Sequence, residues 1–452
     1  MVLPFRRQLS FFWSGKLVTP PNEAWVSISV DRCKEVLSSP HNTDSTPKGS
    51  WNSDTAMTDA SIQRRNALPI LYTSGTYYEV GHDVGRTFRS RITDFLASIK
   101  NRHTGLLTKY STGEGKISYD TTLATLQENF PHYVRELQGI ADGALVPFYH
   151  LMVLHIASTY ERFIFQAKTD DSSNDDPGKV TSFFGCSSVI VNMEGEILLG
   201  HTEDALKELT SNIYLVSAHI MEETPQGRWQ TKEEHFTALC YAGYLPGFCM
   251  GYNRHGLVFS VNAITPLRVF SGKTICCLLC RALLAAESLE DVHNILRDEG
   301  VGVADGMAIN AAFLNPNGDI SFQNLEVGAA GHGERASQLS VLPVNTGNHL
   351  LHTNRYQHLQ APVVENELKW SSLLREARAV QCTPPTKRQH LLDLLSDTHH
   401  PEHPFFLTKS HFVTTTLGLF DLLKRKWTFW MDNPMTCQPL LSLPLVFSWD
   451  KE

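Results

Sequence analysis

The feature that most constrains the fold is a change of hydrophobic pattern near Ser182. Before it, apolar residues recur at intervals of three and four, as Val84, Phe88 and Ile92 do, which is the period of an amphipathic helix. After it, short runs rich in β-branched and aromatic residues dominate. An acidic stretch that contains Pro and Gly, residues 169–179, separates the two parts, and we expect it to be an exposed loop.

The order of the expected elements indicates the fold class. In the first part we expect a strand at Leu68–Thr73 and helices over residues 84–99, 130–140 and 145–165. The expected strands of the second part are Ser187–Val191, Glu196–Leu199, Ile213–Ile220, Thr237–Tyr241, Leu257–Val261, Ala308–Leu314, Asp319–Phe322 and Val413–Leu419. Helices interrupt these strands at about Lys273–Arg297 and, as a pair, within residues 366–396. Strand runs followed by helices, without strict βαβ alternation, favour a largely antiparallel, layered α+β domain.

Composition and charge exclude several classes of protein. The chain has 452 residues, of which 42% are apolar and 19% charged, as in soluble globular proteins with a large core. Its formal charge of −8 is spread without a basic block, so we expect no nucleic-acid partner. Residues 38–64 are polar and show almost no apolar period. We therefore interpret residues 1–66 as a flexible N-terminal extension and residues 67–452 as the folded domain.

The N-terminal region and the cysteines bear on the compartment. The apolar run Leu9–Trp13 is too short for a secretory signal or a membrane span, and no later segment spans a bilayer, so we expect no membrane association. A mitochondrial transit peptide stays open as an alternative, because residues 1–22 carry no acid. Nine cysteines in a long chain without a signal peptide are typical of reduced thiols, which indicates a cytoplasmic protein.

A Gly185–Cys186 bond stands directly before the first strand of an expected hairpin, whose turn is Asn192–Gly195. If the Cys186 thiol attacks the Gly185 carbonyl, the peptide bond becomes a thioester that water can cleave, and Cys186 becomes a new N-terminus. Gly185 has no Cβ and can adopt the strained backbone that this attack requires. The freed amine, with a pKa of about 8, can then act as the base for its own thiol. The alternative is that Cys186 is a small buried residue at a strand start.

Three motifs, in order along the chain, carry a resemblance to a known family. They are Gly75–Gly85 (GTYYEVGHDVG), Gly185–Ser187 (GCS) and Gly200–Asp204 (GHTED). Over residues 67–435 the sequence resembles the acyl-CoA:6-aminopenicillanic-acid acyltransferase family of N-terminal-nucleophile (Ntn) hydrolases. Within that family, Cys240–Gly247 (CYAGYLPG) and Gly300–Gly306 (GVGVADG) resemble the arthropod Tan-type hydrolases, which cleave β-alanyl-dopamine and β-alanyl-histamine (carcinine).

The resemblance implies a fold and a processing step. The fold it implies is a four-layer αββα sandwich with largely antiparallel sheets. It also implies self-cleavage between Gly185 and Cys186, which would give an alpha chain of residues 1–185 and a beta chain of residues 186–452 that remain partners in one enzyme.

The resemblance further implies roles for three residues. Cys186 is the nucleophile, and the family's acidic residue, eighteen positions later at the end of the next strand, corresponds to Asp204. A hairpin returns such a residue to the side of the nucleophile, while Glu203 would point to the opposite face of the strand. The oxyanion-hole Asn of the family corresponds to Asn262, with capping of a strand before a turn as the alternative. One departure is clear, because the family's late-strand Arg aligns with Val413.

The substrate implied by the resemblance is a small N-β-alanyl amine, and the reaction is amide hydrolysis. Four aromatic residues, which are ordinary core residues in the alternative interpretation, are candidates to line a pocket for the catechol or imidazole: Tyr241, Tyr244, Phe248 and Tyr252. A nearby acid would bind the ammonium group. An acyl-CoA-dependent acyltransferase acting on a small amine, and an uncleaved, non-catalytic binding relative, are the competing hypotheses.

Two groups of potential metal-binding side chains are not interpreted as metal sites. Cys276, Cys277 and Cys280 fall in an apolar, helix-like run without a second pair at zinc spacing. The histidines at 399, 400 and 403 fall in a loop bounded by prolines, where solvated histidines are usual. The chain also has no dinucleotide fingerprint or phosphate-binding loop, so we expect neither a metal nor a cofactor.

Overall fold

The computed structural model describes residues 67–157, 184–408 and 412–450. The expected extension at residues 1–66, the acidic loop at residues 169–179 and the helix expected beyond residue 157 therefore lie outside the described residues. The chain is helical over residues 148–157, up to the edge of that range.

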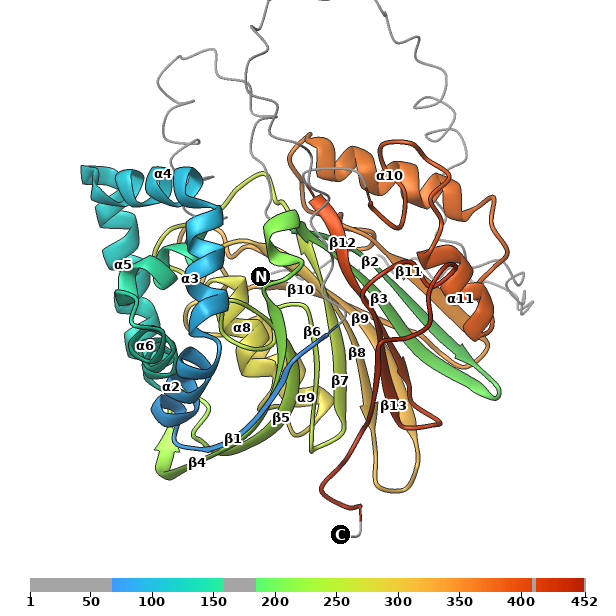
Figure 1. Ribbon diagram of the computed structural model, residues 1–452, viewed down its shortest axis with the longest axis horizontal. Coiled ribbons are helices and arrows are strands. Elements are labelled where there is room, and N and C mark those ends of the chain that lie inside the picture. The colour runs from blue at the N-terminus through green and yellow to red at the C-terminus, as the bar shows by residue number, and fades with distance from the viewer. Residues whose placement is uncertain (1–66, 158–183, 409–411, 451–452) are drawn as a thin grey trace, which may run out of the picture.

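Two β-sheets pack face to face, and helices cover the outer face of each, which gives four layers (Figure 1). The eight-stranded sheet has the order β1 (Ile70–Gly75), β4 (Ile213–Gln226), β5 (Thr231–Tyr241), β6 (Met250–Asn253), β7 (Leu257–Ile264), β8 (Gly306–Leu314), β9 (Ile320–Gly328), β10 (Gln338–Pro343). The six-stranded sheet has the order β11 (Asn348–His352), β2 (Phe184–Met193), β3 (Glu196–Leu206), β12 (Phe412–Asp421), β13 (Lys426–Trp430), β14 (Leu441–Pro444). Neighbouring strands pair antiparallel, except that β1 pairs with β4 in parallel. The expected α+β sandwich is confirmed.

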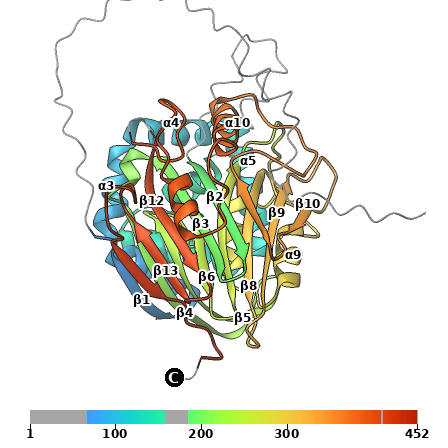
Figure 2. The same ribbon diagram turned by 90° about the vertical axis from the view of Figure 1, so that its right-hand side faces the viewer.

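Helices lie on both outer faces of the sandwich. Beside the eight-stranded sheet lie α2 (Tyr77–Thr87), α3 (Arg89–Ser98), α4 (Lys100–Ser111), α5 (Gly113–Asn129), α6 (Pro131–Ala144), α8 (Cys276–Leu283) and α9 (Leu289–Arg297). Beside the six-stranded sheet lie α10 (Glu367–Ala379) and α11 (Arg388–Leu395), as Figure 1 shows, and Figure 2 views that sheet from the side of these helices. Among the described helices, none is long and apolar enough to cross a membrane.

The alternation of side chains along β2 decides which layer each residue meets. Ile190 belongs to the large apolar core, which extends between the two sheets and under α2 and α6, whereas Val189 and Val191 belong to the smaller core beneath α10 and α11. By the same alternation, Cys186 faces the eight-stranded sheet, and Gly185 faces α10.

The predicted hairpins are confirmed, and their turns use the expected glycines. β2 and β3 pair antiparallel around a turn in which Gly195 has φ 79°, and β8 and β9 pair around a turn in which Gly318 has φ 92°. These left-handed angles are open to glycine at little steric cost. The turn at residues 192–195 sets the register that brings Cys186 opposite Glu203.

Two helix predictions are wrong in their extent. The helix expected over residues 84–99 is divided at Phe88, which has the non-helical angles φ −104° and ψ 21° and links α2 to α3. The helix expected at Lys273–Arg297 is also two helices, because Ser288 caps a new one by accepting a hydrogen bond from Asp291 N. In both places the apolar period continues across the break, so periodicity alone does not reveal it.

Candidate active site

Cys186 is buried between the two sheets, near the beginning of β2. Its side chain is 1% exposed, and its thiol donates a hydrogen bond to Val261 O in β7 at 3.4 Å. The residue directly across the ladder is Glu203 in β3, whose side chain faces the same way. Burial raises the pKa of the Cys186 thiol, and the Glu203 carboxylate raises it further. The thiol therefore stays protonated unless a base removes its proton.

Asn354, two residues beyond β11, holds both reactive atoms of Cys186. Its Oδ1 accepts a hydrogen bond from Cys186 N at 3.1 Å, and its Nδ2 lies 3.2 Å from Cys186 Sγ and 2.9 Å from Ala263 O. The bond from Nδ2 to sulfur lowers the pKa of the thiol, against the effect of burial. Our sequence analysis missed this residue, because β11 is a short strand that the pattern did not reveal.

Arg375 of α10 brings a buried positive charge to the same place. Its Nη1 donates to Cys186 O and to Ser187 Oγ, both at 2.6 Å, and its Nη2 donates to Asn354 Oδ1 at 2.8 Å. Val413, which aligns with the family's late-strand Arg, lies in β12 opposite Ala205. The guanidinium beside the cysteine therefore comes from a helix. The sequence predicted this helix but contained no signal that singled out Arg375.

Asp204 lies across the ladder from Gly185, on the α10 face of the sheet. Its Oδ1 accepts a hydrogen bond from Thr414 Oγ1 at 2.5 Å. Burial raises the pKa of Asp204 to about 6, while the Arg375 guanidinium and the Thr414 hydroxyl oppose that rise. Asp204 and Glu203 thus point to opposite faces, but the expected assignment of the faces is wrong, because Glu203 and not Asp204 lies on the face of the thiol.

Asn262 lies in β7, on the opposite sheet, and faces β2. Its Oδ1 accepts hydrogen bonds from Ser188 Oγ at 2.9 Å and from Asn310 Nδ2 at 2.7 Å, and its Nδ2 donates to His352 O at 3.5 Å. Ser188 is the next β2 residue on the same face as Cys186. These bonds fix Asn262 within a buried polar layer beside the cysteine.

Glu203 is the centre of a second group of polar side chains near Cys186. His201 Nε2 lies 2.8 Å from Glu203 Oε2, and the hydroxyl of Tyr241 donates to Glu203 Oε1. Burial lowers the pKa of His201 to about 3, so the imidazole is neutral. Burial also raises the pKa of Glu203 well above its usual range. The register of the predicted hairpin already pairs Cys186 with Glu203, so this neighbour was available from the sequence.

The four candidate aromatic residues do not all lie together. Tyr241 contacts Glu203, and Tyr244 packs edge-on against Tyr241 with ring centroids 6.1 Å apart. Phe248 is half-buried at the edge of the large core. Tyr252 instead packs against Trp427 and Phe447, in a different part of the interface between the sheets. The structure therefore brings Tyr241, and through it Tyr244, to the cysteine.

Gly185 has ordinary strand geometry, because its φ lies outside the left-handed range. A Cβ at this position would lie 3.4 Å from Leu368 Cδ1 of α10 and 3.6 Å from Asp204 Cβ. The strained backbone considered for this bond is thus absent here, and a Cβ would make ordinary van der Waals contacts with Leu368 and Asp204.

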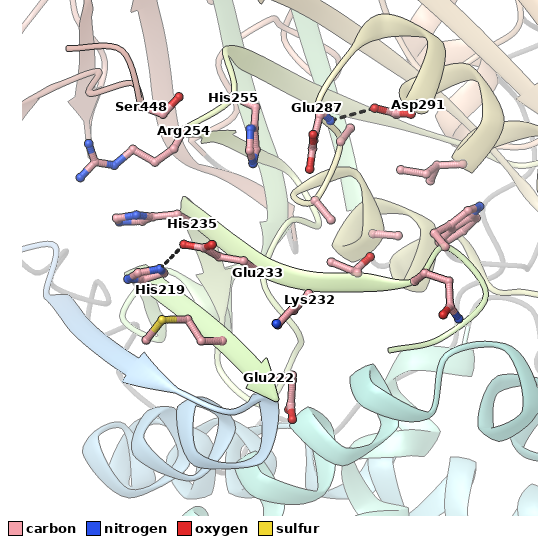
Figure 3. Close-up of a pocket in the computed structure, with 18 of the residues that line it drawn as sticks. His219, Glu222, Lys232, Glu233, His235, Arg254, His255, Glu287, Asp291 and Ser448 are labelled. Carbon is pink, nitrogen blue, oxygen red and sulfur yellow. Dashed lines mark hydrogen bonds and ion pairs between the residues drawn. The ribbon is translucent and has the colours of Figure 1, made fainter. Parts of the chain in front are cut away.

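A large open cavity of about 1080 Å³ lies at the other end of the eight-stranded sheet (Figure 3). It is lined by the far ends of β4 and β5, where His219 Nε2 lies 2.7 Å from Glu233 Oε1, and by the turn at Arg254 and His255. The residues that surround Cys186 do not line it. We therefore separate this cavity from the candidate active site.

The structure also shows where side chains that could bind a metal ion lie. Cys276, Cys277 and Cys280 are buried in α8, as expected. Within the described ranges, the grouping that has the spacing of metal ligands is Cys186, His201 and Glu203, whose ligand atoms lie within 4.8 Å of one another.

Comparison with known proteins identifies the family to which the chain belongs. The family model of the acyl-coenzyme A:6-aminopenicillanic acid acyl-transferase matches residues 191–436. The chain is also 38% identical over 390 residues to the beta-alanyl-dopamine/carcinine hydrolase of Drosophila melanogaster, a match that covers 85% of this chain and 98% of the fly protein. On both grounds, the chain belongs to the acyl-coenzyme A:6-aminopenicillanic acid acyl-transferase family.

Proposed function

We propose that this protein is an N-terminal-cysteine amidohydrolase that releases β-alanine from small N-β-alanyl amines such as β-alanyl-dopamine and carcinine. The observation that carries the proposal is the double contact of Asn354 with the nitrogen and the sulfur of Cys186. It holds together the two groups that a self-activating terminal cysteine needs. The similarity to a fly hydrolase of β-alanyl-dopamine and carcinine supports the substrate class.

The first step is cleavage of the chain itself. Cys186 Sγ attacks the Gly185 carbonyl carbon, the C–N bond breaks, and the nitrogen takes a proton to become the amine of Cys186. Water then hydrolyses the thioester, which leaves Gly185 as a carboxylate and the thiol free. The products are an alpha chain of residues 1–185 and a beta chain of residues 186–452.

The freed Cys186 then acts on the substrate. Its amine, with a pKa of about 8, takes the proton of the thiol, and the thiolate attacks the amide carbonyl. Asn262 donates to the oxyanion, and Asp204 and Asn354 orient the terminal residue. The departing amine takes a proton from the Cys186 ammonium, and water hydrolyses the β-alanyl thioester, which regenerates the thiol.

A cleavage and turnover assay tests this function. Purified protein is expected to show two bands on a denaturing gel, a fragment whose N-terminal sequence is CSSVIV, and β-alanine release from β-alanyl-dopamine. Cys186→Ala is expected to show one band and no release, and Cys186→Ser to be cleaved slowly. A single band from protein that turns over substrate would contradict the proposal, and an intact, inactive protein would favour the binding relative.

Acyl transfer is the second candidate, because the matching family is named for an acyltransferase. Both reactions pass through the same Cys186 thioester and differ in the acceptor. Following β-alanine release with and without added coenzyme A separates them. Hydrolysis predicts release without coenzyme A, and strict dependence on it would favour the transferase.

We also propose a cytoplasmic location. The described cysteines from Cys186 to Cys437 are free thiols, which suits a reducing compartment. Localisation of a tagged full-length chain in cells tests this, and a mitochondrial signal would support the alternative of a transit peptide.

A further inference from the structure

Glu203 is a buried carboxylate that lacks a cationic partner within the described part of the chain. Its side chain is 2% exposed, and its partners there are the neutral His201 and the hydroxyl of Tyr241. Two other buried carboxylates each have a guanidinium, since Glu136 pairs with Arg281 and Glu376 with Arg355. Burial disfavours the charged form of such a carboxyl, and a cation bound beside it would stabilise that form.

The position of Glu203 points to the substrate as the source of that cation. Glu203 is the cross-strand neighbour of Cys186 and faces the same side of the sheet, between the two sheets. Its carboxylate lies within 4.8 Å of the sulfur. Asp204, the adjacent acid, points to the other face, where it is near Arg375. A cation that arrives with an acyl group on the sulfur therefore meets Glu203.

We propose that Glu203 is the specificity-determining residue that binds the terminal ammonium of a short aminoacyl group while Cys186 attacks its carbonyl. This inference rests on the proposed function and assigns one side chain to substrate choice. His201 and Tyr241 are positioning residues, because each hydrogen-bonds one carboxylate oxygen and so fixes its direction. Each oxygen keeps a second lone pair that can accept from an ammonium.

The separation of the two groups limits the length of the acyl chain. In an extended β-alanyl thioester the ammonium lies about 5 Å from the sulfur, and an ammonium–carboxylate hydrogen bond adds about 2.8 Å. Together the two segments exceed the separation of 4.8 Å between the sulfur and the carboxylate, so a β-alanyl group reaches Glu203 only when it bends sharply. Each further methylene lengthens the acyl group by roughly 1.3 Å and moves the ammonium past the carboxylate, within a buried space where an unpaired charge is costly. The site therefore favours one or two methylenes between carbonyl and ammonium.

The first test uses the processed wild-type protein and a series of dopamine amides. The acyl groups are β-alanyl, 4-aminobutanoyl and butanoyl, of which butanoyl matches the shape of β-alanyl but has a methyl in place of the ammonium. We expect kcat/KM for the β-alanyl amide to exceed that for the butanoyl amide by about 10²-fold or more. Equal rates for these two amides would overturn the inference and leave hydrolysis standing. Cleavage of none of them would contradict the proposed function instead.

The second test changes the carboxylate. Glu203→Gln is expected to reduce the preference for β-alanyl over butanoyl to within about fivefold, mainly through KM, while cleavage of the butanoyl amide persists. Glu203→Asp keeps the charge but withdraws it by one methylene, so the preference should move toward 4-aminobutanoyl. A preference unchanged in both variants would overturn the inference.

A matched control separates recognition from general disturbance. Glu376→Gln removes another buried carboxylate near the site, one that binds Arg355 and Thr353 on the α10 side. It is expected to keep the wild-type preference between β-alanyl and butanoyl. If the Glu203 variants do not fold, the wild-type series decides alone, because a rate that ignores the ammonium contradicts the inference.

Discussion

The thiol of Cys186 is surrounded by groups with opposite effects on its ionisation. Burial and the carboxylates of Glu203 and Asp204 raise its pKa, whereas hydrogen bonds from Asn354 and from the backbone lower it. A carboxylate repels the thiolate, but a hydrogen-bond donor aimed at sulfur stabilises it. Asn354 is therefore the neutral side chain through which the protein favours the reactive form.

Replacing Asn354 with Ala is expected to slow both self-cleavage and turnover. The variant loses the donor to sulfur and the acceptor of the Cys186 nitrogen, so kcat/KM should fall by about 10²-fold. Alkylation of Cys186 by iodoacetamide should also need a higher pH, because the thiol pKa rises. Asn348→Ala, an exposed position in β11, is the control and should behave as wild type. An unchanged alkylation profile in the Asn354 variant would contradict this role.

The raised pKa of the Asp204 carboxyl predicts that activity depends on pH. Burial raises its pKa to about 6, and the carboxyl is ionised above that value, so activity that needs the carboxylate is lost as pH falls through 6. Below it, kcat/KM should fall about tenfold per pH unit. Thr414→Val removes a hydrogen bond that stabilises the carboxylate, so this limb of the profile should move to higher pH. If the acid side of the pH profile does not move in the Thr414→Val variant, the titrating group is not Asp204.

At the scale of elements, the sequence predicted those features that depend on local pattern. The hairpin of β2 and β3 is an example, since its turn and antiparallel pairing are as predicted, although Glu203 and not Asp204 lies on the face of the thiol. The sequence did not predict β11, because a strand of five residues shows too little hydrophobic periodicity. It did not single out the buried Arg375 of α10 either, because an arginine in a helix is usually solvated. Asn354 and Arg375 reach Cys186 across 168 and 189 positions of chain, a proximity that tertiary packing alone creates.

The packing of α2 against α6 gives a prediction about glycine. A Cβ on Gly81 would lie 2.1 Å from Glu136 O, and one on Gly139 would lie 2.3 Å from Tyr78 O, so the helix backbones are in direct contact. Gly81→Ala should therefore lower the free energy of unfolding in urea by about 2–3 kcal/mol. Gly105→Ala in α4, where nothing lies within 4 Å, should instead raise it by about 0.5–1 kcal/mol. If Gly81→Ala and Gly105→Ala change the free energy of unfolding equally, α2 and α6 can move apart at little cost.

For the whole molecule, the proposed cleavage divides a continuous core between two chains. The alpha chain would contribute β1, which pairs with β4 of the beta chain, and the helices α2 to α6. Arg281 of α8 would hold the two chains together, because its guanidinium binds Glu136 of α6 at 2.8 Å and Glu234 of β5 at 2.5 Å. These contacts are fully buried, so we expect the two chains to remain together after cleavage.

The Arg281→Met variant tests whether these buried ion pairs hold the two chains together. The substitution leaves Glu136 and Glu234 buried without their cation, and breaking a buried ion pair in this way costs about 3–5 kcal/mol. Processed wild-type protein should elute as one species that contains both chains until a denaturant unfolds it. The variant should lose the alpha chain at a lower urea concentration.

The control is Arg297→Met, which removes the same type of side chain at an exposed position of α9 and should not shift the urea concentration at which the chains separate. Burial raises the pKa of Glu136 to about 7 even with Arg281 beside it, so in the Arg281→Met variant this pKa lies higher, and the defect should grow as pH rises above 7. Co-elution of both chains from the variant at wild-type urea concentrations would mean that β1 pairing and helix packing suffice.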